Sequence, residues 1–97
     1  MNTESAAKQL AELGHATRLS IYRLLVKGGH TGLPVGDVQA ELGVPGSTLS
    51  HHISRLVSVG LIEQRREGRV LYCVPVYEKL DALVDFLKDE CCSNELE

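Results

Sequence analysis

The first sixty residues place apolar side chains three or four positions apart. This spacing runs through four segments that each end at a glycine, residues 3–14, 15–29, 35–43 and 47–60. It gathers the apolar residues on one face of a helix, and a terminal glycine favours the backbone conformation that ends a helix. The pattern therefore predicts four helices, with a loop over residues 29–34 between the second and the third.

Beyond residue 60 the period changes. Residues 61–75, "LIEQRREGRVLYCVP", form two short stretches around "REGR", where Gly68 can take the positive φ of a tight hairpin turn. Residues 76–92 return to helical spacing, and Cys91 extends their apolar stripe. The sequence therefore predicts a β-hairpin and then a fifth helix, and it leaves residues 93–97 as a flexible acidic tail.

The helices predicted over 35–43 and 47–60 are short and closely joined. A short helix, the turn "LGVPG" and a second helix form a helix-turn-helix pattern. The basic hairpin that follows makes the pattern a winged helix-turn-helix. The predicted fold class is therefore mainly α with a small β-hairpin, in the order four helices, two strands and a last helix. Residues 1–92 are predicted to form this single domain.

The outer face of the helix over 47–60 is polar and carries no acid. It holds Ser47, Thr48, Ser50, His51, Ser54, Arg55 and Ser58, with His52 at its edge. Such a helix can enter the major groove of DNA without repelling phosphates, and its side chains can reach base edges. Arg65, Arg66 and Arg69 flank the hairpin tip, where they can meet the DNA backbone or the minor groove.

A plainer interpretation of the same features is a solvated polar helix and an ordinary charged turn, because helix pairs of this kind are common. The acid-free helix and the basic hairpin together favour DNA binding. His51 and His52 could instead ligate a metal ion, but no cysteine or carboxylate stands near them in the sequence. Contact with DNA is therefore the preferred interpretation of the two histidines.

Composition and charge narrow the class of protein. The net charge of −3 is uneven: residues 1–75 hold eight basic and six acidic side chains, and residues 76–97 hold two and seven. The mildly basic body is compatible with a polyanionic partner. No signal peptide or membrane-spanning stretch is visible, so we expect a cytoplasmic protein without a membrane partner. No catalytic motif is visible either, so we expect no enzymatic activity.

Three stretches carry a resemblance that covers nearly the whole chain. "LAELGHATRLSIYRLL", "VGDVQAELGVPGSTLSHHISRLVSVGLIEQRREGRVLYCV" and the last helix are similar to the ArsR/SmtB family of metal- and metalloid-responsive repressors. The resemblance implies a homodimer built through the first and last helices. It also implies binding to a double-stranded operator, which blocks transcription until an effector binds. By position, the family reads DNA at Ser47, Thr48, Ser50, His51 and His52, and its wing falls at Arg66 and Arg69.

The sequence departs from this family at three places. The family's arsenic site, a C-V-C-D-L run, is replaced by "PVGDV" at residues 34–38, which has no thiol. The family's zinc-type site uses Asp and His on the last helix, and residues 76–92 contain no histidine. Pro45 stands where a hydroxyl usually caps the reading helix, so we expect Ser47 to cap a helix that begins slightly later.

Any effector site must then use the three cysteines, Cys73, Cys91 and Cys92. Thiolates suit soft centres. Trivalent arsenic or antimony takes up to three of them, and a methylated arsenical needs two. A helix over 76–91 would be about 22 Å long, so one chain cannot bring Cys73 to Cys91. Antiparallel pairing of the last helices would instead bring Cys73 to Cys91 and Cys92 of the other subunit. Family members with arsenical sites away from the third helix resemble this layout.

Other roles for the cysteines stay open. Cys73 and Cys91 could be small apolar core residues, because free cysteine is often buried. Oxidation could join Cys73 to the other subunit's Cys91, which would make the protein a redox-sensing repressor. Zinc is a weaker candidate, because three thiols without an obvious fourth ligand fit a tetrahedral site poorly. A protein that sequesters arsenicals or binds another protein, without binding DNA, is a further alternative. We expect no cofactor in the DNA-bound state.

Overall fold

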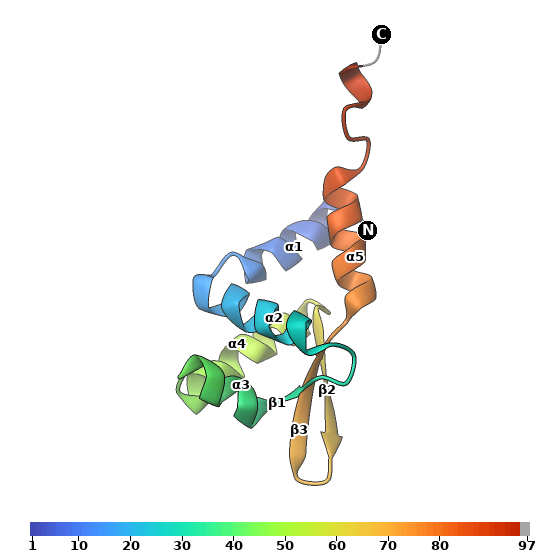
Figure 1. Ribbon diagram of the computed structural model, residues 1–97. Helices are drawn as coiled ribbons and strands as arrows, with labels where there is room; N and C mark the ends of the chain where they lie inside the picture. Colours follow the sequence, from blue (N-terminus) through green and yellow to red (C-terminus); the bar gives the residue numbers. More distant parts are fainter. Residues whose placement is uncertain (96–97) are drawn as a thin grey trace.

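The computed structural model describes residues 1–95 of the 97-residue chain. All five predicted helices are present, together with the predicted hairpin. The elements are α1 Thr3–Leu13, α2 Ala16–Gly28, β1 Leu33–Pro34, α3 Val35–Leu42, α4 Gly46–Ser58, β2 Ile62–Glu67, β3 Val70–Pro75, α5 Tyr77–Lys88 and a 3-10 turn, η1 Ser93–Glu95. The mainly α fold with a small β-hairpin is therefore confirmed (Figure 1).

A third strand extends the hairpin. Leu33 and Pro34 pair antiparallel with Cys73 and Tyr72, so the strand order is β1-β3-β2. The prediction of a loop over residues 29–34 is therefore wrong for its last two residues, which form β1. Gly32 makes the pairing possible: its φ is +80°, and a Cβ there would lie 2.8 Å from the carbonyl oxygen of Cys73. Only glycine fits such a close approach of two backbones. As a result, β3 is the central strand and Cys73 has a strand on each side.

The last helix ends earlier than predicted. α5 stops at Lys88, and Asp89 already has extended dihedral angles, φ −55° and ψ 134°. The negative charges of Asp89 and Glu90 would be repelled by the negative, C-terminal end of the helix dipole. This repulsion disfavours a longer helix. The prediction that Cys91 extends the apolar stripe of this helix is therefore wrong. The predicted tail, 93–97, begins with η1, and residues 96–97 lie outside the described part of the chain.

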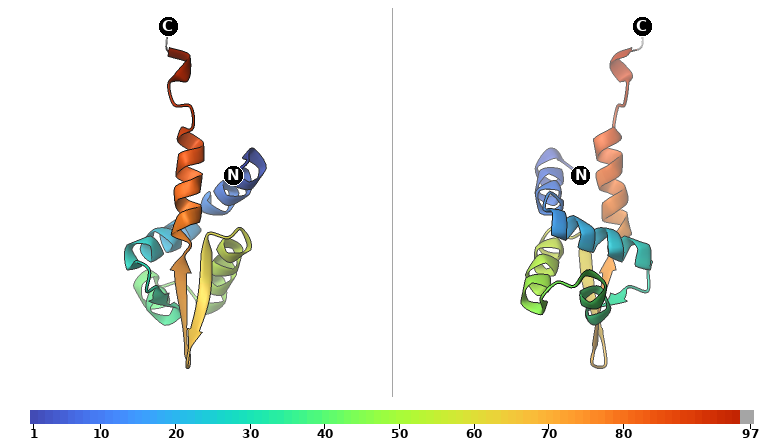
Figure 2. Two further views of the ribbon diagram at one scale, coloured as in Figure 1. Left: turned by 90° about the vertical axis from the view of Figure 1, so that its right-hand side faces the viewer. Right: turned by 60° about the vertical axis from the view of Figure 1, so that its left-hand side comes forward.

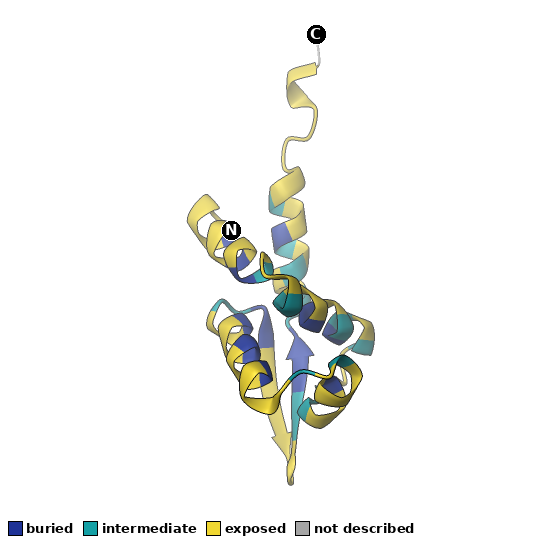
Figure 3. Cartoon of the chain, turned by 90° about the vertical axis from the view of Figure 1, so that its left-hand side faces the viewer, coloured by how far each residue is buried: buried dark blue, intermediate teal, exposed yellow. Residues whose placement is uncertain are grey.

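One core joins α2, α3, α4 and the sheet. Its fully buried side chains come from all of these elements: Ile21, Leu25, Val38, Leu49, Leu56, Leu61, Ile62 and Cys73. The apolar stripes of the predicted helices supply most of them, as the period of 3.6 residues requires. Figure 3 shows the buried residues gathered where α2 and α4 face the sheet. This core fixes α4 against the hairpin.

The molecule is elongated. α5 and the hairpin extend in opposite directions, and the protein measures 58 × 23 × 21 Å (Figures 1 and 2). Its radius of gyration is 15.2 Å, against about 12.5 Å for a compact domain of this length. Large apolar side chains are exposed on α1 and α5, among them Leu10, Val84 and Leu87. Within residues 1–95, no helix is long and apolar enough to cross a membrane.

Candidate nucleic-acid interface

The packing of α4 decides which of its side chains face outward. Leu49, Ile53 and Leu56 are buried in the core. Four of the predicted DNA-reading positions, Ser47, Thr48, Ser50 and His51, are therefore exposed on the outer side, and so is Ser54 beside them. The helix contains no Asp or Glu, so this face does not repel a phosphate backbone.

The start of α4 differs from the prediction. The helix begins at Gly46 with Pro45 at its N-cap, and the amide of Leu49 donates to the carbonyl of Pro45 at 2.9 Å. Ser47 thus lies within the first turn and caps nothing, so the predicted capping role is wrong. Proline fits the extended N-cap position because it has no amide hydrogen to satisfy there. The Ser47 hydroxyl stays exposed on the outer face.

His52 does not share this exposure, although His51 beside it does. The His52 side chain is only 6% exposed, because position 52 lies on the inner flank of the helix. Its Nδ1 accepts a hydrogen bond of 3.2 Å from Nε of Arg18, and its ring lies 4.8 Å from that of His15. Burial, together with the nearby Arg18, lowers the pKa of His52. The prediction that His52 reads DNA does not fit this position.

Arg55 is half-exposed, but its guanidinium is already engaged. Nε and Nη2 of Arg55 donate to the two carboxylate oxygens of Glu12, at 3.2 and 2.5 Å. Glu12 lies in the last turn of α1, is 8% exposed, and also accepts from Arg18. Sequence reasoning missed Glu12, because a lone carboxylate on a helix is normally taken as solvated. The only available signal was its spacing, three residues after Gln9 and six after Ala6, which are both buried.

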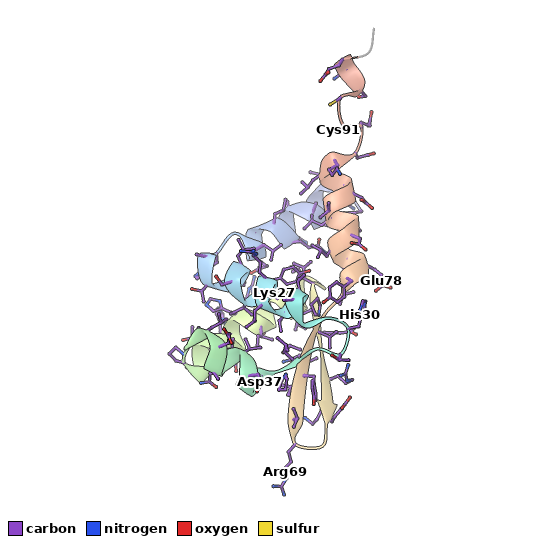
Figure 4. The ribbon with its side chains drawn as sticks, viewed as in Figure 1. Lys27, His30, Asp37, Arg69, Glu78 and Cys91 are labelled. Atoms are coloured by element: carbon purple, nitrogen blue, oxygen red, sulfur yellow. The ribbon has the colours of Figure 1, made fainter. Side chains whose placement is uncertain are left out.

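The hairpin presents a basic tip. Gly68 has φ +63°, as predicted for the turn, and Arg66 and Arg69 are exposed beside it. Figure 4 shows Arg69 pointing away from the tip into solvent. Arg65 behaves differently, because its guanidinium donates to Glu67 at 2.6 Å and to the carbonyl of Thr31 at 2.8 Å. Arg65 therefore ties the hairpin to the preceding loop, whereas Arg66 and Arg69 are exposed at the hairpin tip.

Cys73 belongs to the core. Its side chain is fully buried in β3, and its Sγ accepts a hydrogen bond of 3.7 Å from Nε2 of Gln64 on β2. Burial raises the pKa of the Cys73 thiol, which disfavours the reactive thiolate. A thiol in this position cannot meet the tail of a second subunit without opening of the sheet. The structure therefore favours the apolar role of Cys73 over its predicted role as a ligand.

Cys91 and Cys92 are placed quite differently. Both are exposed, and their Sγ atoms lie 3.4 Å apart in the turn that follows α5. This turn lies at the end of the molecule opposite the hairpin tip (Figure 4). Hydrogen bonds with Cys91 and Glu95 raise the pKa of Cys92. In the described residues no group of three His, Cys, Asp or Glu side chains is arranged for a metal ion. The tail thus offers two neighbouring thiols, not a complete three-ligand site.

An acid-free helix held by the core beside a basic hairpin defines the winged helix-turn-helix class of DNA-binding transcriptional regulators. Comparison with known families agrees, since the family described as "Helix-turn-helix domain" matches residues 13–65. Within this class, the chain belongs to the ArsR family of transcriptional regulators. Members of this family act on DNA as regulators and not as enzymes.

Individual relatives support this assignment. The chain is 32% identical over 92 residues to the HTH-type transcriptional regulator YgaV of Escherichia coli, covering 94% of this chain and 90% of that protein. It is 34% identical over 80 residues to the putative arsenical resistance operon repressor ArsR2 of Halobacterium salinarum, covering 82% and 66%. Among solved structures, it resembles the homodimeric winged helix-turn-helix DNA-binding domain of Mb0332 from Mycobacterium bovis. That match has a TM-score of 0.70 and 31% identity, and covers 91% and 82% of the two chains.

Proposed function

We propose that the protein is a homodimeric repressor that reads a two-fold operator through the N-terminal half of α4. The observation that carries this proposal is the exposed, acid-free row of Ser47, Thr48, Ser50 and His51, backed by a fully buried inner face. The exposed Leu10, Val84 and Leu87 supply an apolar surface on α1 and α5 for a second copy. The homodimeric state of the Mycobacterium bovis relative supports the same assembly.

Binding to DNA is tested by fluorescence anisotropy with the promoter beside the protein's own gene and with a scrambled duplex. We expect a clear preference for the promoter and an affinity that falls steeply with salt, because each phosphate contact releases counterions. His51→Ala should reduce the preference without changing the circular dichroism spectrum. Equal binding to both duplexes at every salt concentration would refute operator recognition.

The effector is proposed to be a trivalent arsenical or antimonial bound by Cys91 and Cys92. The separation of 3.4 Å between their Sγ atoms supports this, because one arsenic atom can bond to two thiolates that lie so close. Each bond forms when a thiol displaces a hydroxide of the arsenical, and its proton leaves with that hydroxide as water. A methylated arsenical would be held by this pair and would keep its methyl group as the third ligand, and arsenite would keep one hydroxide as its third ligand. The name of the Halobacterium relative, an arsenical resistance operon repressor, favours the same effector class.

The thiol proposal is tested by titrating the protein–operator complex with arsenite, antimonite and methylarsenite. Cys91→Ser and Cys92→Ser should each abolish release and leave operator affinity unchanged. Cys73→Ser serves as the matched control, because its thiol is buried, and it should release normally. Loss of release in Cys73→Ser alone would instead support the site between subunits that the sequence suggested.

A thiol redox switch at the same pair is the second candidate. The short distance between Cys91 and Cys92 also favours oxidation of the pair by a peroxide or a disulfide. Release of the operator by such an oxidant, reversed by a dithiol reductant, would identify this mechanism. Release by arsenicals under reducing conditions would identify the metalloid mechanism.

A further inference from the structure

Three helices meet at one carboxylate. Oε1 of Glu12, on α1, accepts a hydrogen bond of 2.6 Å from Nη1 of Arg18 on α2. The same carboxylate accepts two hydrogen bonds from Arg55 on α4. Nη1 of Arg18 also donates to the backbone carbonyl of Glu12 at 3.3 Å. The end of α1 is thereby connected to α2 and to the reading helix, α4.

Glu12 and Arg55 both keep their charges at neutral pH, so the ion pair between them stays formed. The hydrogen bond from Arg55 lowers the pKa of Glu12, and the charges of Arg55 and Arg18 act in the same direction, while burial opposes them. Glu12 in turn raises the pKa of Arg55. A guanidinium that binds both oxygens of a carboxylate is directional as well as strong. The pair therefore restricts where Arg55 can lie and which way it can turn.

A second bond fixes α4 next to the first. Nε of Arg18 donates to Nδ1 of His52, so Arg18 links Glu12 to α4 through a second side chain. Positions 52 and 55 are three apart and lie on one side of the helix. Of the exposed residues, His51 lies four positions before Arg55 and is its neighbour on the helix surface, and Ser47 and Ser50 lie farther round the helix. Holding α4 at the buried His52 and at the half-exposed Arg55 sets its rotation about its own axis, and so the direction of the reading face.

We propose that Glu12 is a positioning residue for operator recognition. It touches no DNA. It holds Arg55 and Arg18 so that α4 presents its N-terminal half at a fixed angle, and it makes that angle depend on the position of α1. Arg55 accordingly acts as an anchor of the helix, not as a DNA contact. This inference rests on the operator binding proposed above and adds the residue that orients the reading helix.

The test is a double-mutant cycle with Glu12→Gln, Arg55→Gln and the combined variant, each confirmed as folded by circular dichroism. We measure the affinity for operator and for a scrambled duplex across salt concentrations. Each single variant should lower the operator-to-scrambled ratio about tenfold, equal to about 1.4 kcal/mol. The combined variant should be no worse than Glu12→Gln alone, because Glu12→Gln already removes the interaction that Arg55→Gln removes. Glu4→Gln removes an exposed carboxylate of the same helix and should change nothing.

Arg55→Lys separates anchoring from charge, and it serves in place of any variant that fails to fold. Lysine keeps the positive charge but lacks the planar fork that grips both carboxylate oxygens. We therefore expect Arg55→Lys to lose specificity as Arg55→Gln does, with the salt dependence of wild type. Additive losses in the double variant, or a salt slope that falls by about one in Arg55→Gln alone, would make Arg55 a phosphate contact and overturn the inference. A wild-type protein with no operator preference would refute the proposed function instead, which is a separate outcome.

Discussion

The reading helix α4 and the segment after Lys88 differ in how firmly the rest of the molecule holds them. α4 is fixed by a buried apolar face and by the carboxylate of Glu12, and its reading face is rigidly presented. The segment after Lys88 is exposed at every described residue and has few partners beyond its own turn. Base recognition requires side chains in fixed positions, whereas capture of a small thiophilic molecule requires accessible thiols. The proposed function places DNA reading on α4 and chemical sensing on the segment after Lys88, and this difference supports that proposal.

The same contrast separates residues of one type. Cys73 lies at the centre of a three-stranded sheet, and Cys91 and Cys92 lie in an exposed turn. His51 faces solvent, and His52 beside it is buried against Arg18 and His15. Position relative to the core, not residue type, therefore decides which of these groups can act on an external molecule.

The largest expected difference is in thiol reactivity. With an aromatic disulfide reagent, Cys91 and Cys92 should react at once, because both are exposed. The reaction rate of Cys73 should be at least roughly a thousandfold lower, since its thiol becomes accessible only when the core opens. Counting reacted thiols against time in native and denatured protein checks this. Three equally fast thiols would mean that Cys73 is accessible and would remove the contrast.

The next difference is in stability. Leu56→Ala should lower the free energy of unfolding by ~2–5 kcal/mol at every protein concentration, because Leu56 is fully buried on the inner face of α4. Leu87→Ala removes a 58% exposed side chain of α5. If that side chain packs on a second copy, its effect on the melting temperature should shrink as the protein is diluted below the dimer dissociation constant, because the monomer leaves Leu87 in solvent. Melting curves at several concentrations distinguish the two; a concentration-independent loss at Leu87 would argue against an interface there.

A smaller effect is expected at the hairpin. Arg66→Gln with Arg69→Gln should weaken binding to operator and scrambled DNA by similar factors, because phosphate contacts carry no sequence information. Each lost contact should flatten the slope of log affinity against log salt by about 0.9. Arg65→Gln is the matched control for charge, since Arg65 is engaged with Glu67 and Thr31. An unchanged slope in the double variant would show that the hairpin does not touch the backbone.

The smallest effect concerns pH. The pKa of His52 is lowered in the folded protein, so the folded state binds fewer protons than the unfolded state just below pH ~6.5. Stability should therefore be unaffected by this group above that pH and should fall as the pH drops toward the folded pKa. His52→Gln should flatten this dependence, and His51→Gln should leave it in place. Urea unfolding between pH 5 and 8, at about half-unit steps, measures both slopes; identical slopes in all three proteins would contradict the buried, neutral His52.

Local patterns predicted most of the fold. The helical periods, the terminal glycines and Gly68 identified five helices and the hairpin, because these features depend on neighbours in the sequence. Strand β1 was missed, because two residues carry no period and the pairing depends on contact with β3 forty residues later. The end of α5 was missed because the pattern of apolar residues continued while the stabilising core did not.

The site was predicted less completely than the fold. The exposed face of α4 followed from its period, and so did the basic tip of the hairpin. The burial of His52 and the engagement of Arg55 depend on Glu12 and Arg18, which lie 34 to 43 residues away in the sequence. No spacing rule reports such a contact. The burial of Cys73 likewise follows from its place in the central strand, which required β1.

Footprinting of the operator by wild-type protein tests the central claim most directly, namely that two copies of the α4 face read DNA. We expect protection of two major-groove segments on one side of the duplex, related by two-fold symmetry and about one helical turn, ~34 Å, or a multiple of it apart. His51→Ala should lose both segments together. No protection at low salt, or a single unsymmetrical segment, would contradict the account.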